Sequence, residues 1–357
     1  MIPISLHNLY LCFGLLLIGF TSKSAANVFD DVYGAGDYKS ARSQYLRSMP
    51  NDDIRGPLTP HFVNFLERYG YSEFKFNRPD LGPYGSFGGK VTDYDIIRNY
   101  PVIFIHGNSD GALAIEGTHS SGFSSSISYF LNHGYTSAEL YATTWGDDRV
   151  LANATTRGHS CKHLIYVRKF VEAVLQYTGA RFVNIIAHSM GVTLGRRVIK
   201  GGSFPTKGGY CNLGQPLGAY VNVFIGIAGA NIGMCLCSRP EMTMYPTCNE
   251  ETGFWPGNNC RTNNYGDCDQ RQPQLVCAGP RYSTFLETLN LDHTPIGRFV
   301  ASIWSMKDEI LPNGGQVYGY NTSYLLETNT YSIYPNLSHD QVKDETADFQ
   351  YQLVRNY

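Results

Sequence analysis

Apolar residues gather in short runs that recur along the chain from residue 101 onward. Four of these runs cover residues 101–105, 182–186, 220–228 and 298–304. Runs of this length are typical of parallel strands that are buried on both faces. Two further segments, 139–144 and 330–334, are predicted as strands of the same sheet.

Between the strands the apolar positions change to a spacing of three and four residues. In the segment 161–177, for example, Leu164, Val167 and Val171 follow the spacing of an amphipathic helix. Further helices are predicted at 58–69, at 121–132, after residue 189 and from about residue 341, whereas the glycine-rich segment 82–89 is predicted as a loop. Alternating strands and helices predict an α/β fold, with a mainly parallel central sheet and helices on both faces.

One junction between a strand and a helix is tighter than the others. The run 182–186 leads into Ala-His-Ser-Met-Gly at residues 187–191, where Gly191 lets the next helix lie close to the sheet. This is the G-x-S-x-G nucleophile elbow with Ala187 in place of its first glycine, and such a turn lifts the hydroxyl of Ser189 clear of the sheet edge. A junction that contains a serine by chance is the alternative.

An elbow serine needs a histidine as base and an acid that fixes the tautomer of that histidine. In this architecture the chain order is serine, acid, histidine. Asp308 follows the strand 298–304, and His339 follows the strand 330–334. Because loops after parallel strands meet at the carboxyl edge of the sheet, we predict Asp308 as the acid and His339 as the base.

Two other carboxylates lie close to these residues in the sequence. Glu309 is the neighbour of the predicted acid and stays the reserve for that role. Asp340 directly follows the histidine and is too close in sequence to lie easily behind its ring. A lone loop histidine is often an ordinary surface residue, but His339 follows the last strand in the order that a triad requires.

The negative charge that forms during such a reaction needs two preorganised N–H donors. The main-chain amide of Met190, directly after the serine, is predicted as one donor, and the amide of Asn108, in the loop after the strand 101–105, as the other. His106 is interpreted as a residue that braces this loop. His188 is expected to face away from the hydroxyl of its neighbour, so neither histidine is predicted as the base.

Length, composition and charge set the domain organisation. With 357 residues, of which 43% are hydrophobic and 16% charged, the chain can form one large domain with insertions. The formal net charge of −2, without a long run of either sign, does not suggest a nucleic-acid surface. We predict an N-terminal extension packed on the core at 27–98 and a main domain at 99–357, in which the segment 231–293 interrupts the alternation.

The first 26 residues have the features of a signal peptide. An apolar core at 11–20 precedes small residues that suit cleavage after Ala26 or close to it. The n-region lacks a clear positive charge, so a retained membrane anchor is the alternative, but the apolar core is short for a bilayer span. We therefore predict a signal peptide at 1–26 and a secreted protein.

The cysteines agree with an oxidising compartment. Nine are present, and removal of Cys12 with the signal peptide leaves eight, an even number. Six of these lie within 235–277 without the paired C-x-x-C units of zinc sites, so we predict disulfides and no metal, with the pairing left open. Sequons at Asn153, Asn321 and Asn336 agree with passage through a secretory pathway.

Taken together, these motifs resemble those of a known family. The segment 102–108, the elbow and the turns at Asp308 and His339 look like the secreted class 2 lipases, over about residues 58–350, and the segments 56–65 and 85–89 look like the nematode-type branch. The resemblance implies an α/β-hydrolase fold and hydrolysis of acyl esters without a cofactor. It places the triad and oxyanion roles on Ser189, Asp308, His339, Asn108 and Met190.

The segment 231–293 departs from the minimal bacterial members of that family. It lies between the strand 220–228 and the strand that precedes Asp308, and this connection begins at the carboxyl edge of the sheet. Its apolar content is low, so we expect a disulfide-stapled cap beside the acyl pocket with little core of its own. A stabilising segment that never touches substrate is the alternative.

Two other functions stay open at this point. A secreted peptidase or acyltransferase would use the same triad, and would release amines or transfer the acyl group to an alcohol. A non-catalytic lipid-binding protein has no need of a nucleophile, a base, an acid and an oxyanion loop together. The predicted partner is a lipid or other acyl-ester substrate, with peripheral contact to lipid interfaces and no nucleic acid.

Overall fold

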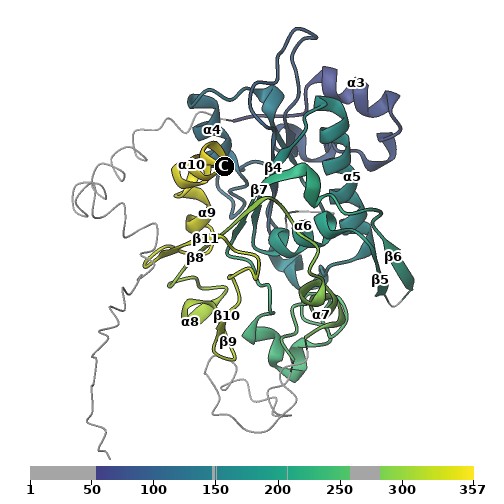
Figure 1. Cartoon of the computed structure of the whole chain (residues 1–357). Coiled ribbons are helices and arrows are strands. Elements are labelled where there is room, and N and C mark those ends of the chain that lie inside the picture. The colour runs from purple at the N-terminus through teal and green to yellow at the C-terminus, as the bar shows by residue number, and fades with distance from the viewer. Residues whose placement is uncertain (1–53, 147–148, 150, 207, 258–281) are drawn as a thin grey trace, which may run out of the picture.

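The computed structural model describes residues 54–146, 149, 151–206, 208–257 and 282–357 (Figure 1). The predicted signal peptide at 1–26, residues 27–53 of the predicted extension, and Cys260, Cys268 and Cys277 lie outside the described residues. Within the described ranges, no helix combines the length and the apolar character that a membrane crossing requires.

A seven-stranded sheet forms the centre of the molecule, in the order β1-β3-β2-β4-β7-β8-β11. Its strands are β1 (Ser86–Phe87), β2 (Val102–Ile105), β3 (Leu140–Thr143), β4 (Val183–His188), β7 (Val221–Ile227), β8 (Phe299–Ser305) and β11 (Thr330–Tyr334). The pairings are parallel except that of β1 with β3. The predicted mainly parallel sheet is confirmed, and each predicted strand lies within one or two residues of the observed one.

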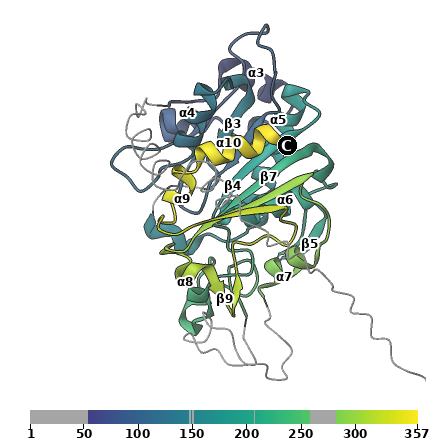
Figure 2. The ribbon, with the colours of Figure 1, turned by 60° about the vertical axis from the view of Figure 1, so that its left-hand side comes forward.

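Successive side chains of the central strands enter two different cores. On β2, Ile103 and Ile105 join one core, whereas Val102 and Phe104 join the other, as the alternation along a strand requires. The first core is covered by α3 (Pro60–Arg68), α5 (Cys161–Thr178) and α6 (Met190–Lys200), and the second by α4 (Ser124–Asn132), α9 (Gln341–Asp344) and α10 (Ala347–Asn356) (Figures 1 and 2). Helices on both faces confirm the predicted layers.

Local sequence fixes the ends of the longest helix. The side chain of Ser160 accepts a hydrogen bond from the main-chain N–H of His163 at 3.3 Å, which caps the start of α5. Gly179 ends it in the left-handed region at φ 60°, a conformation that glycine adopts without strain. These caps explain why the sequence prediction for this helix is accurate to one residue.

The described part of the N-terminal region, residues 54–98, packs on the main sheet. β1 extends the sheet by pairing Ser86 with Thr143 and Phe87 with Ala142. On α3, the ring of Phe62 stacks on Tyr177 with a centroid distance of 4.3 Å. The loop prediction for 82–89 was wrong at residues 86–87, because a two-residue strand among glycines carries no periodicity.

Several short elements have no counterpart in the sequence prediction. The strands are β5 (Ser203–Thr206), β6 (Gly209–Asn212), β9 (Gln316–Val317) and β10 (Tyr320–Asn321), and the helices are α7 (Thr284–Leu291) and α8 (Pro312–Gly315). Short 3₁₀ helices lie at Ser72–Phe74, Pro79–Tyr84, Ser137–Glu139, Leu151–Thr156, Gly218–Tyr220, Cys235–Ser238 and Pro240–Met242. A disulfide between Cys161 and Cys211 ties the β5–β6 hairpin to the start of α5.

The described parts of the segment 231–293 contribute to the main core. Phe254 and, on α7, Phe285 and Leu289 are buried in the same core as α5 and α6. A second disulfide joins Cys237 to Cys248, and Cys235 is also disulfide-bonded, which confirms disulfides in this segment. The sequence did not predict that these side chains join the main core, and the expectation that the segment has little core of its own is not contradicted.

Candidate active site

Ser189 lies at the bend between β4 and α6, in the conformation that a nucleophile elbow requires. Its backbone has φ 53° and ψ −126°, a region that residues with a side chain rarely adopt and that costs about 1–3 kcal/mol. The main-chain N–H of Ser189 donates to the carbonyl oxygen of Ile227 at 2.8 Å, which fixes the bend against the neighbouring strand. Its side chain is partly exposed between two buried neighbours, His188 and Met190.

Two glycines let other backbone segments approach this bend closely. A Cβ atom on Gly191 would lie 2.3 Å from the carbonyl oxygen of Ile105, so a side chain there would separate α6 from the loop after β2. A Cβ atom on Gly107 would lie 2.9 Å from Cβ and 3.5 Å from Oγ of Ser189. The elbow and the loop that carries Asn108 therefore stand in direct contact.

His339 and Asp308 meet although they follow different strands. His339 Nδ1 lies 2.7 Å from Asp308 Oδ2, and both side chains are buried. The other carboxylate oxygen, Oδ1, accepts from the main-chain N–H groups of Ile310 at 2.9 Å and Leu311 at 2.7 Å. Because the carboxylate accepts a hydrogen bond from Nδ1, the proton of neutral His339 resides on Nδ1. Its Nε2 is then free to accept a second proton.

The carboxylate held in reserve has a different role. Glu309 Oε2 accepts from the main-chain N–H of His339 at 2.9 Å and supports the loop instead of the ring. Asp340 is half-buried, and burial raises the pKa of its carboxyl. Of these three carboxylates, Asp308 is the one whose side chain forms a hydrogen bond with the imidazole of His339.

The carboxylates also decide the basicity of His339. Burial alone would lower its pKa, but the hydrogen bond and the negative charge of Asp308 outweigh that effect, with smaller contributions from Asp340 and Glu309. The pKa of His339 is therefore raised above its ordinary value. A raised pKa strengthens the neutral ring as a proton acceptor.

The two amides predicted as oxyanion donors lie on the two elements that meet at the elbow. Met190 is the first residue of α6, where main-chain N–H groups have no partner within the helix. Asn108 lies in the loop after β2. Within the part of the chain that the structure describes, neither N–H donates to a protein acceptor, so both remain available.

The side chain of Asn108 is used to anchor its loop. Its Nδ2 donates to the carbonyl oxygen of Ala154 at 2.8 Å, and the guanidinium of Arg157 donates to Ser109 Oγ at 2.7 Å. Ser109 itself has a positive φ of 62°. The loop is therefore held in an unfavourable backbone conformation by contacts with the turn at 154–157.

His106 braces this loop, as expected from the sequence. Its Nε2 accepts from the main-chain N–H of Trp145 at 2.9 Å, so its Nδ1–H donates to the carbonyl oxygen of Gly107 at 2.7 Å. The ring also stacks on Trp145. Burial lowers the pKa of His106 to about 3, which keeps the ring neutral.

His188 supports the loop of the candidate base, a contact that the sequence did not reveal. Its Nε2–H donates to the main-chain oxygen of His339 at 3.0 Å. Burial and then the nearby charge of His339 hold the pKa of His188 well below its ordinary value. The two residues are 151 positions apart, so no local pattern signals this contact.

A buried lysine ties the chain after His339 to the other side of the site. Lys343 on α9 has a fully buried side chain whose Nζ donates to Ser121 Oγ at 2.7 Å and to the carbonyl oxygen of Gly122. Asp110, in the loop after β2, accepts from the main-chain N–H of Gly122 at 2.9 Å. Sequence reasoning missed this network, because lysine is usually exposed.

Two cavities lie elsewhere on the molecule. One of about 620 Å³ is lined by Trp304, Tyr324 and Tyr331 among others, and one of about 750 Å³ by Phe74 and Lys162 among others. Neither lining contains Ser189, Asp308 or His339. The polar contacts of its side chains and main-chain amides therefore define the candidate site.

Known proteins place these features in context. The family model "Lipase (class 2)" matches residues 99–352. No curated protein matches the chain. Among solved structures, a monoacylglycerol lipase from Paleococcus ferrophilus is 13% identical, covers 76% of this chain and 98% of its own, and has a TM-score of 0.41. A Bacillus licheniformis lipase in mature form is 12% identical, covers 75% and 97%, and has a TM-score of 0.43.

With TM-scores of 0.41 and 0.43, these solved structures are only distantly similar to the chain, whereas the family model matches most of it. That match spans well over half of the chain and contains every residue of the candidate site. The parallel sheet with its antiparallel edge strand, its helices on both faces and its strand–serine–helix elbow is an α/β-hydrolase fold. The chain belongs to the class 2 lipase family.

Proposed function

We propose that the protein is a secreted carboxylic-ester hydrolase, a lipase that cleaves triacylglycerol or related acyl esters through an acyl-enzyme intermediate. The observation that carries the proposal is the 2.7 Å hydrogen bond between His339 Nδ1 and Asp308 Oδ2, in a chain whose elbow holds Ser189 at a φ of 53°. A surface loop histidine has no need of a buried carboxylate fixed by two amides.

In the first half of the reaction, Ser189 Oγ attacks the carbonyl carbon of the ester while His339 Nε2 takes its proton. The amides of Asn108 and Met190 hold the negative charge that forms on the carbonyl oxygen. His339 then gives the proton to the leaving alcohol, and the acyl group stays on Ser189.

In the second half, a water molecule attacks the acyl-enzyme while His339 Nε2 takes one of its protons. That proton returns to Ser189 Oγ as the carboxylic acid leaves. Asp308 stays ionised throughout and stabilises the imidazolium that forms in each half. These steps use side chains, main-chain amides and water.

Secretion is the finer part of the proposal. The apolar segment before Ala26 and the disulfides Cys161–Cys211 and Cys237–Cys248 support it, because disulfides persist in oxidising compartments. The nematode-type branch, the division into 27–98 and 99–357, and a cap role for 231–293 likewise stay predictions from the sequence.

The test is hydrolysis of an ester series of increasing acyl length by the purified protein, with Ser189→Ala as the control. We expect release of the carboxylic acid by the wild type and none above background by the variant. Amine release from peptides, or acyl transfer to an added alcohol in preference to water, would instead support a peptidase or an acyltransferase. Lipid binding without turnover would overturn the proposal.

A further inference from the structure

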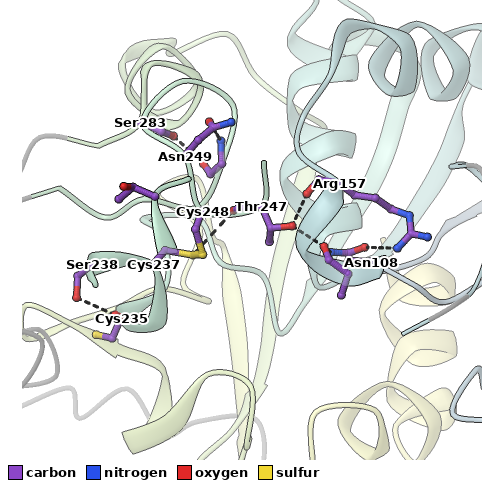
Figure 3. Close-up of a disulfide and its surroundings, with 12 residues drawn as sticks. Asn108, Arg157, Cys235, Cys237, Ser238, Thr247, Cys248, Asn249 and Ser283 are labelled. Carbon is purple, nitrogen blue, oxygen red and sulfur yellow. Dashed lines mark hydrogen bonds between the residues drawn. A yellow bond between two sulfur atoms is a disulfide. The ribbon is translucent and has the colours of Figure 1, made fainter. Parts of the chain in front are cut away.

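A hydroxyl group from the segment 231–293 holds the turn that anchors the Asn108 loop. Thr247 Oγ1 lies 2.5 Å from the carbonyl oxygen of Ala154 and 2.5 Å from that of Arg157, so its single proton serves one of them at a time (Figure 3). The main-chain N–H of Thr247 donates to the carbonyl oxygen of Thr155 at 3.2 Å. The side chain of Asn108 donates a hydrogen bond to the same turn, at the carbonyl oxygen of Ala154.

Thr247 is itself fixed by a disulfide. Its neighbour Cys248 is bonded to Cys237 (Figure 3), and the carbonyl oxygen of Thr247 accepts from the main-chain N–H of Phe254 at 2.7 Å. Phe254 is buried in the main core. The backbone that carries this hydroxyl is therefore held by a disulfide and by a hydrogen bond to a buried core residue. Both restraints limit the movement of the hydroxyl.

A second contact runs from the same segment to the elbow helix. The main-chain oxygen of Thr252 accepts from His159 Nδ1–H at 2.7 Å, and burial lowers the pKa of His159 to about 3. The neutral ring then accepts at Nε2 from the hydroxyl of Thr193, on α6, at 2.6 Å. The close fit extends to Gly158, where a Cβ atom would lie 2.8 Å from the carbonyl oxygen of Pro246.

The segment is thus linked to both elements that carry the proposed oxyanion donors, through the turn at 154–157 and through His159. We infer that Thr247 is a positioning residue, whose hydroxyl, held by the Cys237–Cys248 disulfide, sets the place of the Asn108 main-chain N–H through the turn at 154–157. The inference rests on the proposed function. Its physical basis is that a donor displaced by about 1 Å loses much of its effect on the transition state.

The first test compares Thr247→Val, which keeps the shape but removes the hydroxyl, with Thr247→Ser, which keeps the hydroxyl. We expect kcat/KM for a short-chain ester to fall about tenfold in the valine variant and to recover largely in the serine variant. Thr243→Val is the matched control. Its hydroxyl donates to Pro240 within the same segment, at 2.8 Å, and its loss should leave kcat/KM unchanged.

A second readout separates positioning from general support of the fold. A boronic acid forms a tetrahedral adduct on a nucleophilic serine, whereas an ether analogue of the substrate binds without reacting. In Thr247→Val, the inhibition constant of the boronic acid should rise by the same factor as kcat/KM falls, and that of the ether should stay constant. An unchanged boronic acid constant with a weaker ether would overturn the inference.

Two further variants keep the inference testable if Thr247→Val does not fold. Asn108→Ala keeps the main-chain donor but removes the side-chain hydrogen bond to Ala154. The double variant Cys237→Ala, Cys248→Ala removes the disulfide that supports Thr247. Each should reproduce the proportional loss of kcat/KM and of boronic acid affinity. Combined with Thr247→Val, Asn108→Ala should cost no more than the larger single loss, because both act through one turn. Fully additive losses would contradict the shared path.

Failure of the inference and failure of the proposed function give different results. If Ser189→Ala abolishes hydrolysis while Thr247→Val, Thr247→Ser and the wild type are equal, the inference alone is wrong. If Ser189→Ala leaves hydrolysis intact, the proposed function is wrong, and the inference falls with it.

Discussion

The central sheet and the segment 231–293 hold their shape in different ways. In the sheet, apolar strands such as β4 and β7 are buried along their whole length, so the hydrophobic pattern alone specifies them. In the segment, a disulfide, an α-helix of eight residues and main-chain hydrogen bonds hold a chain with few apolar side chains. Both regions nevertheless share one core, through Phe254 and Phe285.

The sheet and the segment therefore act on the candidate site in different ways. The carboxyl edge of the sheet positions Ser189, Asp308 and His339, because the loops after parallel strands meet there. The segment 231–293 then contacts the turn at 154–157, which also binds Asn108, and it is linked through His159 to the helix α6. The sheet places the candidate catalytic groups, and we propose that the segment refines the positions of the candidate N–H donors around them.

The largest expected effect lies in the sheet-edge residues. Asp308→Asn should lower kcat by about 10⁴-fold, because the amide cannot stabilise the imidazolium and favours the wrong tautomer of His339. Steady-state kinetics on a soluble ester would measure it. Glu309→Gln is the matched control, since Glu309 contacts the main-chain N–H of His339, and should cost far less. A reversed order of the two effects would move the acid to Glu309.

The contribution of the segment to the core gives the next effect. Phe285 on α7 is almost fully buried, so Phe285→Ala should lower the free energy of unfolding by about 3–5 kcal/mol. Glu287→Ala, at an exposed position of the same helix, should change it by less than about 0.5 kcal/mol. Chemical denaturation would compare the two variants. Equal and small changes would mean that the segment merely rests on the sheet.

The pH dependence of kcat/KM tests the electrostatics of the sheet edge. The raised pKa of His339 means that the ring is protonated, and cannot accept the serine proton, at any pH below that raised value. Activity should therefore fall about tenfold per pH unit on an acid limb placed above the ordinary histidine pKa of about 6.5. Asp340→Asn removes one of the charges that raise the pKa, and should move the limb to lower pH. A limb unmoved by this change would contradict that contribution.

The smallest effect tests whether the segment also borders the acyl chain. Met244 is 77% exposed, so Met244→Ala should leave stability nearly unchanged. If the segment is a cap, the ratio of kcat/KM for long and short acyl esters should change by about fourfold, which corresponds to the burial of roughly one methylene group. A constant ratio would favour a segment that never touches the substrate.

The sequence predicted the parts of the fold that follow from hydrophobic periodicity. The strand 330–334 was placed without error, and α5 to within one residue, because apolar spacing and helix caps are local signals. Periodicity is absent from β1 and from the glycine-containing β5–β6 hairpin, so both were missed. The core residues of α7 were missed because its neighbouring sequence has low apolar content.

The candidate site was predictable as far as chain order goes. Order and strand ends pointed to Ser189, Asp308 and His339, and the structure brings the last two into contact. Order alone could not separate Asp308 from Glu309, since the direction of a loop side chain depends on tertiary contacts. The support from His188, and from Thr247, joins segments distant in the chain and leaves no local pattern.

We propose Ser189 as the nucleophile, and covalent labelling of the active site tests this role without relying on turnover. A fluorescent alkyl phosphonate should label the wild type with one adduct, which peptide mapping locates on Ser189, and Ser189→Ala should be unlabelled and inactive while its unfolding transition stays close to that of the wild type. The hydroxyl of a partly exposed residue contributes little to the free energy of unfolding, so its removal should leave the fold intact. Undiminished labelling of Ser189→Ala, or an adduct on another residue, would mean that Ser189 is not the nucleophile.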